Sequence, residues 1–174
     1  MSRRGLTSLP SSGKTPEASA ESSSVESPTS GGVLVESLVL VGRVLFSAVF
    51  VGSAVGGHFA STKETAQYGE MRGLPNARIL VLVSGVWIGA GGVMMALGIY
   101  PDLAGLMVAA YCLVAAFWVH HFWTDEGMMQ TMEMTNFMKN ISLAGAGIAL
   151  FALFATVGQD LGLQVTGSLF SFDL

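Results

Sequence analysis

Four long apolar segments follow one another along the chain, each bounded by polar residues or by a turn that contains proline. They are residues 33–57, 77–99, 103–119 and 141–157. The first exceeds the roughly 20 residues that an α-helix needs to cross the hydrocarbon core of a bilayer. The pattern therefore predicts an all-α membrane protein built as a bundle of four transmembrane helices.

The two ends of the chain differ from this apolar middle. Residues 1–32 are rich in Ser, Glu, Pro and Gly and contain almost no large apolar side chain. Such a segment cannot bury enough surface to offset its chain entropy, so we expect a disordered arm. A cleaved leader is less favoured, because no apolar core follows Arg3 and Arg4 for about thirty residues. A four-helix domain over residues 33–158 and a C-terminal tail over residues 159–174 complete the expected organisation.

Composition supports the membrane assignment and argues against one class of partner. Hydrophobic residues make up 51% of the chain and charged residues only 11%, so apolar surface must face lipid. The net charge is -4 and the basic residues form no block, which argues against nucleic acid or an anionic membrane surface as the partner. The lipid bilayer is the expected partner, and a homo-oligomer is compatible with the sequence.

Small residues recur at a spacing of four in every apolar segment. The pairs are Gly52 with Gly56, Gly85 with Gly89, Gly105 with Ala109, and Gly145 with Ala149. Pairs of this kind let the backbones of two membrane helices approach closely. We therefore expect a compact bundle.

Four crossings bring the first and third loops to the same face of the membrane. The first loop begins with His58, and the third loop, residues 120–140, begins with His120 and His121. All three histidines are therefore expected at one face, opposite the turn at residues 100–102. We expect residues 120–140 to form an interfacial segment between the third and fourth helices. Basic residues near the loops favour a cytoplasmic loop face, whereas the arm without a signal favours the reverse, so the orientation stays open.

Arg43 lies well inside the first apolar segment. A charged side chain at the centre of a membrane helix costs roughly 2.5 to 3.5 kcal/mol on insertion scales, so it should face the bundle interior and find a partner there. The alternative is that Arg43 extends toward the near interface beside Glu36, which lies on about the same helix face. We expect the inward orientation.

Three interpretations compete for the polar residues of the loop face. A metal site could use His58, His121 and Asp125, but the spacing matches no metal-binding motif, and adjacent helical residues point about 100° apart. An aromatic belt with Lys139 extended to the interface would need no ligand, and the residue types alone favour it. The third interpretation is a site for a quinone headgroup.

A quinone site needs hydrogen-bond donors, an apolar or aromatic slot and a proton relay. Phe122 and Trp123 could form the slot. We also expect Asn136, with Glu133 or Asp125, to hold the ammonium of Lys139. The candidate pocket comprises Arg43, His58, His121, Trp123, Asn136 and Lys139.

Several short motifs occur between residues 38 and 153. They are Gly42-Arg43, His58-Phe59, Gly73-Leu74-Pro75, Gly85, Gly91-Gly92, Gly98-Ile99-Tyr100-Pro101, His121-Phe122-Trp123 and Asn136-Phe137-x-Lys139-Asn140. In this combination they resemble the DoxX family of small bacterial and archaeal membrane proteins. The resemblance implies a four-helix membrane fold. It also implies an association with redox systems, since relatives are described as subunits of quinol oxidase or of thiosulfate:quinone oxidoreductase.

On this resemblance we expect a multi-pass inner-membrane protein that is a membrane subunit or a quinone-interacting partner of a respiratory redox complex. The sequence has no flavin, haem or iron–sulfur signature, and Cys112 is its one cysteine, so a stand-alone redox enzyme is not indicated. No covalently bound cofactor is expected, and quinone is the candidate ligand. The alternative is a non-catalytic scaffold or assembly protein whose arm and loops bind partners.

Overall fold

The structure, a computed structural model, describes residues 30–172. Within this range the regular structure is helical, and four helices are long and apolar enough to cross a membrane. They span Ser30–Ala60, Ala77–Leu97, Pro101–Thr124 and Gly127–Val157. The predicted fold class is therefore confirmed. The first helix begins at Ser30, and the rest of the predicted arm lies outside the described residues.

The first half of the chain forms a long helix, a short helix and a second long helix. Helix α1 spans Ser30–Gly52 and continues as a π-helical segment, η1, over Ser53–Ala60. Helix α2 spans Thr62–Met71. Helix α3 spans Ala77–Leu97. It ends at Gly98, whose φ of 70° is in the left-handed region, a conformation that residues with a Cβ adopt only under strain.

The second half begins directly after this turn. Helix α4 spans Pro101–Val114 and also ends in a π-helical segment, η2, over Ala115–Val119. A 3₁₀ turn, η3, covers Phe122–Thr124, helix α5 spans Gly127–Val157, and a last 3₁₀ turn, η4, covers Gly158–Asp160. The expected interfacial segment is thus shorter than predicted, because α5 begins about four turns before Ile141. The polar residues between 127 and 140 belong to α5, so polarity alone did not predict where the loop ends.

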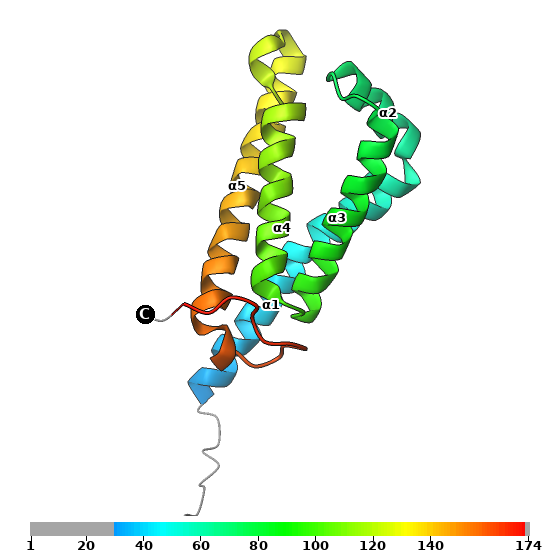
Figure 1. The fold of residues 1–174 in the computed structure, drawn as a ribbon. Helices are drawn as coiled ribbons and strands as arrows, with labels where there is room; N and C mark the ends of the chain where they lie inside the picture. Colours follow the sequence, from blue (N-terminus) through cyan, green and yellow to red (C-terminus); the bar gives the residue numbers. More distant parts are fainter. Residues whose placement is uncertain (1–29, 173–174) are drawn as a thin grey trace, which may run out of the picture.

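The helices form two limbs that join at one end of the molecule, the terminal end, where α1 begins and α5 ends (Figure 1). The first limb comprises α1, η1, α2 and α3, and the second limb comprises α4, η2, η3 and α5. Helix α1 packs on α3, α4 packs along α5, and α3 meets α4 near the turn between them. From that terminal end the two limbs diverge toward the opposite, loop end, which carries α2 and η3.

Glycines set the closest contact within the second limb. A Cβ on Gly105 would lie 2.7 Å from the carbonyl oxygen of Gly147, and a Cβ on Gly147 would lie 2.8 Å from that of Gly105. Any side chain at either position would therefore push α4 and α5 apart. Ala109 packs beside Gly147, so the expected contact of the Gly105 and Ala109 pair is confirmed.

The other predicted glycine pairs have mixed outcomes. Gly85 and Gly89 lie against His58 and Ala54 of η1, as expected. Gly52, Gly56 and Gly145 have no atom within 4 Å of an added Cβ, so the expected packing role of the first and fourth pairs is wrong. The reason is that spacing identifies a helix face but not whether that face points into the bundle. In α5 the packing glycine is Gly147, which lies on a different face from Gly145.

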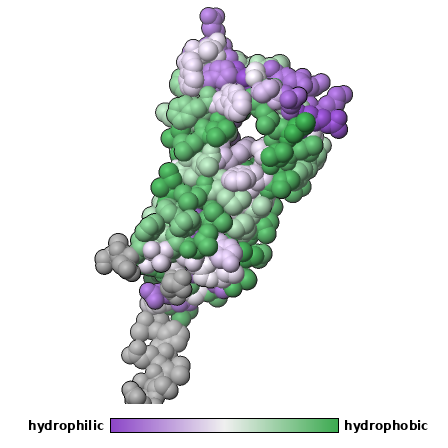
Figure 2. All heavy atoms as spheres, viewed as in Figure 1, coloured by the Kyte–Doolittle hydropathy of each residue, from purple (hydrophilic) through white to green (hydrophobic). Residues whose placement is uncertain are grey.

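The surface carries an apolar belt between two polar ends (Figure 2). Large apolar side chains are exposed along all four long helices, among them Leu45, Val86, Leu113 and Ile148. This distribution is the reverse of a soluble protein's surface, and it suits contact with lipid chains. The polar loop end shows a hollow between the two limbs (Figure 2).

At the terminal end, Arg43 faces the interior. Arg43 is 1% exposed, and its Nη2 donates to the carbonyl oxygens of Leu163 (2.8 Å) and Ala96 (3.3 Å). Its guanidinium carbon lies 5.9 Å from the centre of the Phe154 ring. The inward orientation is therefore confirmed, and the partners are backbone carbonyls and a ring rather than Glu36.

The C-terminal segment, residues 161–172, folds across this end and covers Arg43. The backbone N–H groups of Val165 and Thr166 donate to the Gly98 carbonyl oxygen. The Phe170 N–H donates to Oδ2 of Asp102 over 2.6 Å, and Asp102 is fully buried. We call this segment the C-terminal strap.

Candidate functional site

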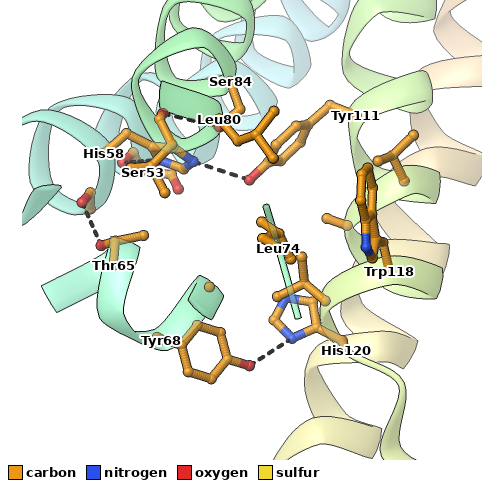
Figure 3. A pocket seen from close by; sticks show the side chains of 16 residues that line it. Ser53, His58, Thr65, Tyr68, Leu74, Leu80, Ser84, Tyr111, Trp118 and His120 are labelled. Atoms are coloured by element: carbon orange, nitrogen blue, oxygen red, sulfur yellow. Dashed lines mark hydrogen bonds between the residues drawn. The ribbon is translucent and has the colours of Figure 1, made fainter. Parts of the chain in front are cut away.

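A cavity of about 320 Å³ lies between the two limbs at the loop end. Its walls come from η1, α2 and α3 on one side and from α4 and η2 on the other. Most of its lining is apolar, including Leu74, Leu80, Val81, Val114 and Trp118. Two hydrogen-bonded pairs of tyrosine and histidine lie on different sides of this apolar space (Figure 3).

The inner pair is His58 with Tyr111. The Nδ1 atom of His58 lies 3.1 Å from the Ser53 carbonyl oxygen, and its Nε2 lies 3.2 Å from the Tyr111 hydroxyl. A carbonyl oxygen only accepts, so Nδ1 carries the proton, and in the neutral ring Nε2 accepts from the tyrosine. The residue is 7% exposed, so this arrangement orients a buried imidazole with both nitrogens partnered.

The outer pair is Tyr68 with His120, and Glu133 joins them. The Tyr68 hydroxyl donates to Oε1 of Glu133 over 2.7 Å, and Nδ1 of His120 lies 2.8 Å from Oε2. The tyrosine hydroxyl and His120 Nδ1 are 3.4 Å apart. Burial, followed by the hydrogen bond to Glu133, raises the pKa of Tyr68 above its ordinary value. Tyr68 therefore remains a hydrogen-bond donor across the neutral pH range.

Arg72 joins the limbs at the same end. Its Nη1 donates to both carboxylate oxygens of Asp125, at 2.8 and 3.0 Å, while Nε donates to the Val119 carbonyl (2.7 Å) and Nη2 to that of His121 (3.2 Å). The hydrogen bond from Arg72 lowers the pKa of Asp125, and the same bond raises the pKa of Arg72. We call this ion pair the Arg72–Asp125 clasp.

Local backbone geometry positions both histidines. His58 lies within η1, and His120 directly follows η2, so each limb carries one π-helical segment beside the cavity. A π-helical turn is wider than an α-helical turn and is frequent at functional sites. The Thr65 hydroxyl donates to the carbonyl oxygen of Gly57 in η1 over 2.7 Å. Gly85 leaves room for the imidazole, since a Cβ there would lie 2.6 Å from the Cβ of His58.

Of the six predicted site residues, only His58 lines this cavity. Nδ1 of His121 bonds the Trp118 carbonyl at 2.9 Å, and Trp123 is 54% exposed, so neither faces the apolar space. Arg43 lies at the opposite end of the bundle. The structure therefore does not bring the six predicted residues together in this cavity. Adjacent residues point in different directions, and the histidine that turns inward is His120.

The remaining two predicted residues lie on α5. Lys139 donates to Oδ1 of Asn136 over 3.3 Å, as expected. Its other expected partners are occupied elsewhere, because Glu133 bonds Tyr68 and Asp125 bonds Arg72. Lys139 lines a second cavity, not the one that contains His58.

Sequence reasoning missed several residues of the site. Tyr68 and Tyr111 line the cavity, and neither is among the predicted site residues. A signal for Tyr111 exists, because Tyr111, Ala115 and Trp118 are spaced as one face of a helix. No comparable signal exists for Tyr68 with Glu133, since 65 positions separate them in sequence.

The hypothesis of a metal site receives no support within residues 30–172. No group of three or more His, Cys, Asp or Glu side chains there could hold a metal ion. In particular, the structure does not bring His58, His121 and Asp125 together as a ligand set.

Comparisons with known proteins agree with this architecture. Residues 38–121 match the family model named DoxX. Inner membrane protein YphA of Escherichia coli (strain K12) is 30% identical over 94 residues, which cover 54% of this chain and 64% of that protein. The chain thus spans slightly less than two thirds of this curated relative, and no solved structure matches it significantly. The family match ends at His121, before the predicted motif at residues 136–140. With its four membrane-spanning helices and these matches, the chain is a multi-pass inner-membrane protein that is similar to the DoxX family over residues 38–121.

Proposed function

We propose that the cavity between the limbs binds the headgroup of a quinone or quinol, and that the chain serves a redox complex as its quinone-interacting membrane subunit. The observation that carries the proposal is the presence of two tyrosine–histidine pairs on different sides of one apolar cavity (Figure 3). A quinone presents a flat apolar ring with a carbonyl oxygen at each end. The cavity offers a polar group near each end and apolar walls between them.

The inner pair can deliver a proton to one carbonyl oxygen. When His58 is protonated, its Nε2–H donates to the Tyr111 oxygen, and the tyrosine hydroxyl becomes free to donate to a ligand. The Ser53 carbonyl holds Nδ1–H in either state. Transfer of the tyrosine proton to the ligand, followed by transfer of the Nε2 proton to Tyr111, returns the pair to its neutral arrangement.

The outer pair can serve the other carbonyl oxygen. Glu133 accepts from both Tyr68 and His120, and it is only 2% exposed. Its two partners keep this buried carboxylate in place, so that protons can move along the three groups from the loop end. Reduction of a quinone to a quinol requires two protons and two electrons. The proposal assigns the protons to this chain and the electrons to a redox-active partner subunit.

Tryptophan fluorescence provides a direct test in the purified full chain. Trp118 lines the cavity, whereas Trp87 and Trp123 do not. Titration with a short-chain benzoquinone should quench the emission with a saturable curve, because quinones quench nearby indoles, and Trp118→Phe should remove that saturable component. His120→Ala should weaken binding about tenfold, the equivalent of one lost hydrogen bond of ~1.4 kcal/mol.

His121→Ala is the matched control, since it removes the adjacent imidazole from outside the cavity. Equal loss in the His120 and His121 variants, or quenching that does not saturate, would reject the quinone site. Purification from native membranes tests the second part of the proposal. A redox-active protein that co-purifies with the chain supports the subunit role, and a single colourless species without quinone supports the scaffold alternative.

A further inference from the structure

A second cavity, of about 220 Å³, lies on the other side of the wall that bounds the first. The two cavities share Ser53, Tyr111 and His120. The second cavity is bounded by α1 on one side and by α5 on the other, and Lys139 and Asn140 of α5 line it. Neither Lys139 nor Asn140 has a role in the proposed quinone site.

Lys139 supplies a cation at this cavity. An ammonium group has three N–H donors, and within residues 30–172 the hydrogen bond to Asn136 occupies one of them at a long 3.3 Å. No carboxylate in that part of the chain lies within ion-pair distance of Lys139, because the ion pairs there join Arg72 with Asp125 and His120 with Glu133. The charge is therefore available to an anionic ligand. Asn140 beside it is buried and donates its amide to the Asn136 carbonyl, which holds this turn of α5 in place.

Apart from these two residues and the three that both cavities share, the lining is apolar. Val49 and Phe50 of α1 and Leu143 of α5 form these walls. Leu143 lies one turn beyond Lys139, so it is further from the loop end and closer to the middle of the helix. The cavity thus has its cation toward the membrane interface and its apolar walls toward the bilayer centre. This is the polarity of an anionic amphiphile that enters from the bilayer with its headgroup at the interface.

We propose that the cavity between α1 and α5 binds an anionic lipid through a phosphate group held by Lys139, with the first part of its acyl chain against Val49, Phe50 and Leu143. The volume suits this occupant, since about 220 Å³ equals the room of roughly seven water molecules at ~30 Å³ each. That is enough for a phosphate and a few methylene groups and too little for a whole lipid. The net charge of -4 does not attract anionic lipids to the molecule as a whole, so the proposed preference for an anionic lipid is a property of this one site.

Native mass spectrometry of the full chain in detergent micelles tests the proposal. Phosphatidylglycerol and phosphatidylcholine are titrated separately, and phosphatidylglycerol should bind more tightly. Lys139→Gln should raise its Kd about tenfold, as expected for one charge-assisted hydrogen bond, and Lys139→Arg should retain most of the affinity. Lys63→Gln is the matched control, because it removes the same charge from an exposed site at the same end of the molecule.

Four outcomes would overturn the proposal. They are equal affinity for the two lipids, no effect of Lys139→Gln, an equal effect of Lys63→Gln, and full competition by inorganic phosphate at the concentration of the lipid. The last outcome would identify a site for a free anion instead. The result does not depend on the quinone proposal. Lys139→Gln should leave quinone quenching intact, whereas Trp118→Phe should leave phosphatidylglycerol binding intact.

Discussion

The Arg72–Asp125 clasp makes stability depend on acid pH. The pKa of Asp125 is lowered by its hydrogen bond with Arg72, so the ionised form favours the folded state. This contribution is fully present above the ordinary aspartate pKa of ~3.9, and it is lost as the pH falls through the lower folded value. Thermal melting across this acid range should therefore show a steeper fall for the wild type than for Asp125→Asn.

Glu64→Gln is the matched control for this comparison, because Glu64 is exposed and belongs to the same limb as Arg72. It should melt with the wild-type dependence on pH. An Asp125→Asn variant with the same dependence would show that the clasp does not contribute to stability. At neutral pH the variant should melt at a lower temperature, because Arg72 then keeps its backbone partners but loses its counter-charge.

The carboxylate of Glu133 affects the ionisation of Tyr68. Burial is the first cause of the raised tyrosine pKa, and the hydrogen bond and charge of Glu133 are the next causes. Glu133→Gln should therefore lower the Tyr68 pKa while leaving it above the ordinary value of ~10, since burial remains. The difference between ultraviolet titrations with and without Tyr68→Phe isolates this phenol from the other two tyrosines. An unchanged pKa would contradict the contact.

At the scale of elements, the contact between α4 and α5 is sensitive to a single methyl group. Gly105→Ala would place its Cβ 2.7 Å from the Gly147 carbonyl oxygen, so the helices must separate. Overpacking of this kind costs about 1 to 3 kcal/mol, and the melting temperature should fall accordingly. Gly145→Ala is the control, because its Cβ meets nothing within 4 Å, and it should be neutral or stabilising by up to ~1 kcal/mol. Equal effects would argue against close packing at Gly105.

The C-terminal strap depends on one buried side chain of α4. Asp102 accepts the Phe170 N–H, so Asp102→Ala should increase hydrogen exchange across residues 161–172. The expected increase is roughly fivefold, which corresponds to ~1 kcal/mol for one lost hydrogen bond. Asp160→Ala removes an exposed carboxylate beside the strap and should leave exchange unchanged. Protection that survives in Asp102→Ala would show that the other strap contacts suffice.

At the scale of the whole molecule, the crossing pattern places both tyrosine–histidine pairs at one membrane face. Reporter fusions at Ser61 and Asp125 should therefore report the same compartment, and a fusion at Asp102 should report the other. Either absolute orientation satisfies this prediction. Opposite compartments for Ser61 and Asp125 would separate His58 from His120 and exclude the cavity.

Much of the architecture follows from the sequence. Four apolar segments of membrane-spanning length determine four helices, because a backbone in lipid must satisfy its hydrogen bonds within each segment. The number of crossings then assigns His58 and His120 to one face before any coordinates are known. The depth of Arg43 likewise predicts its inward orientation, since the cost of exposing a guanidinium to hydrocarbon exceeds the cost of burying it among carbonyl groups.

The membership of the site was decided only by tertiary structure. Hydropathy does not distinguish His120 from His121, and the choice depends on the rotation of one helix end, which the π-helical segment η2 changes. Spacing likewise did not distinguish Gly145 from Gly147, because both lie on α5 and only one meets a neighbouring backbone. The contact of Tyr68 with Glu133 forms because α2, which packs on α3, places Tyr68 within hydrogen-bond reach of the second limb. Such contacts depend on the relative placement of whole helices, and a pattern within one helix carries no information about that placement.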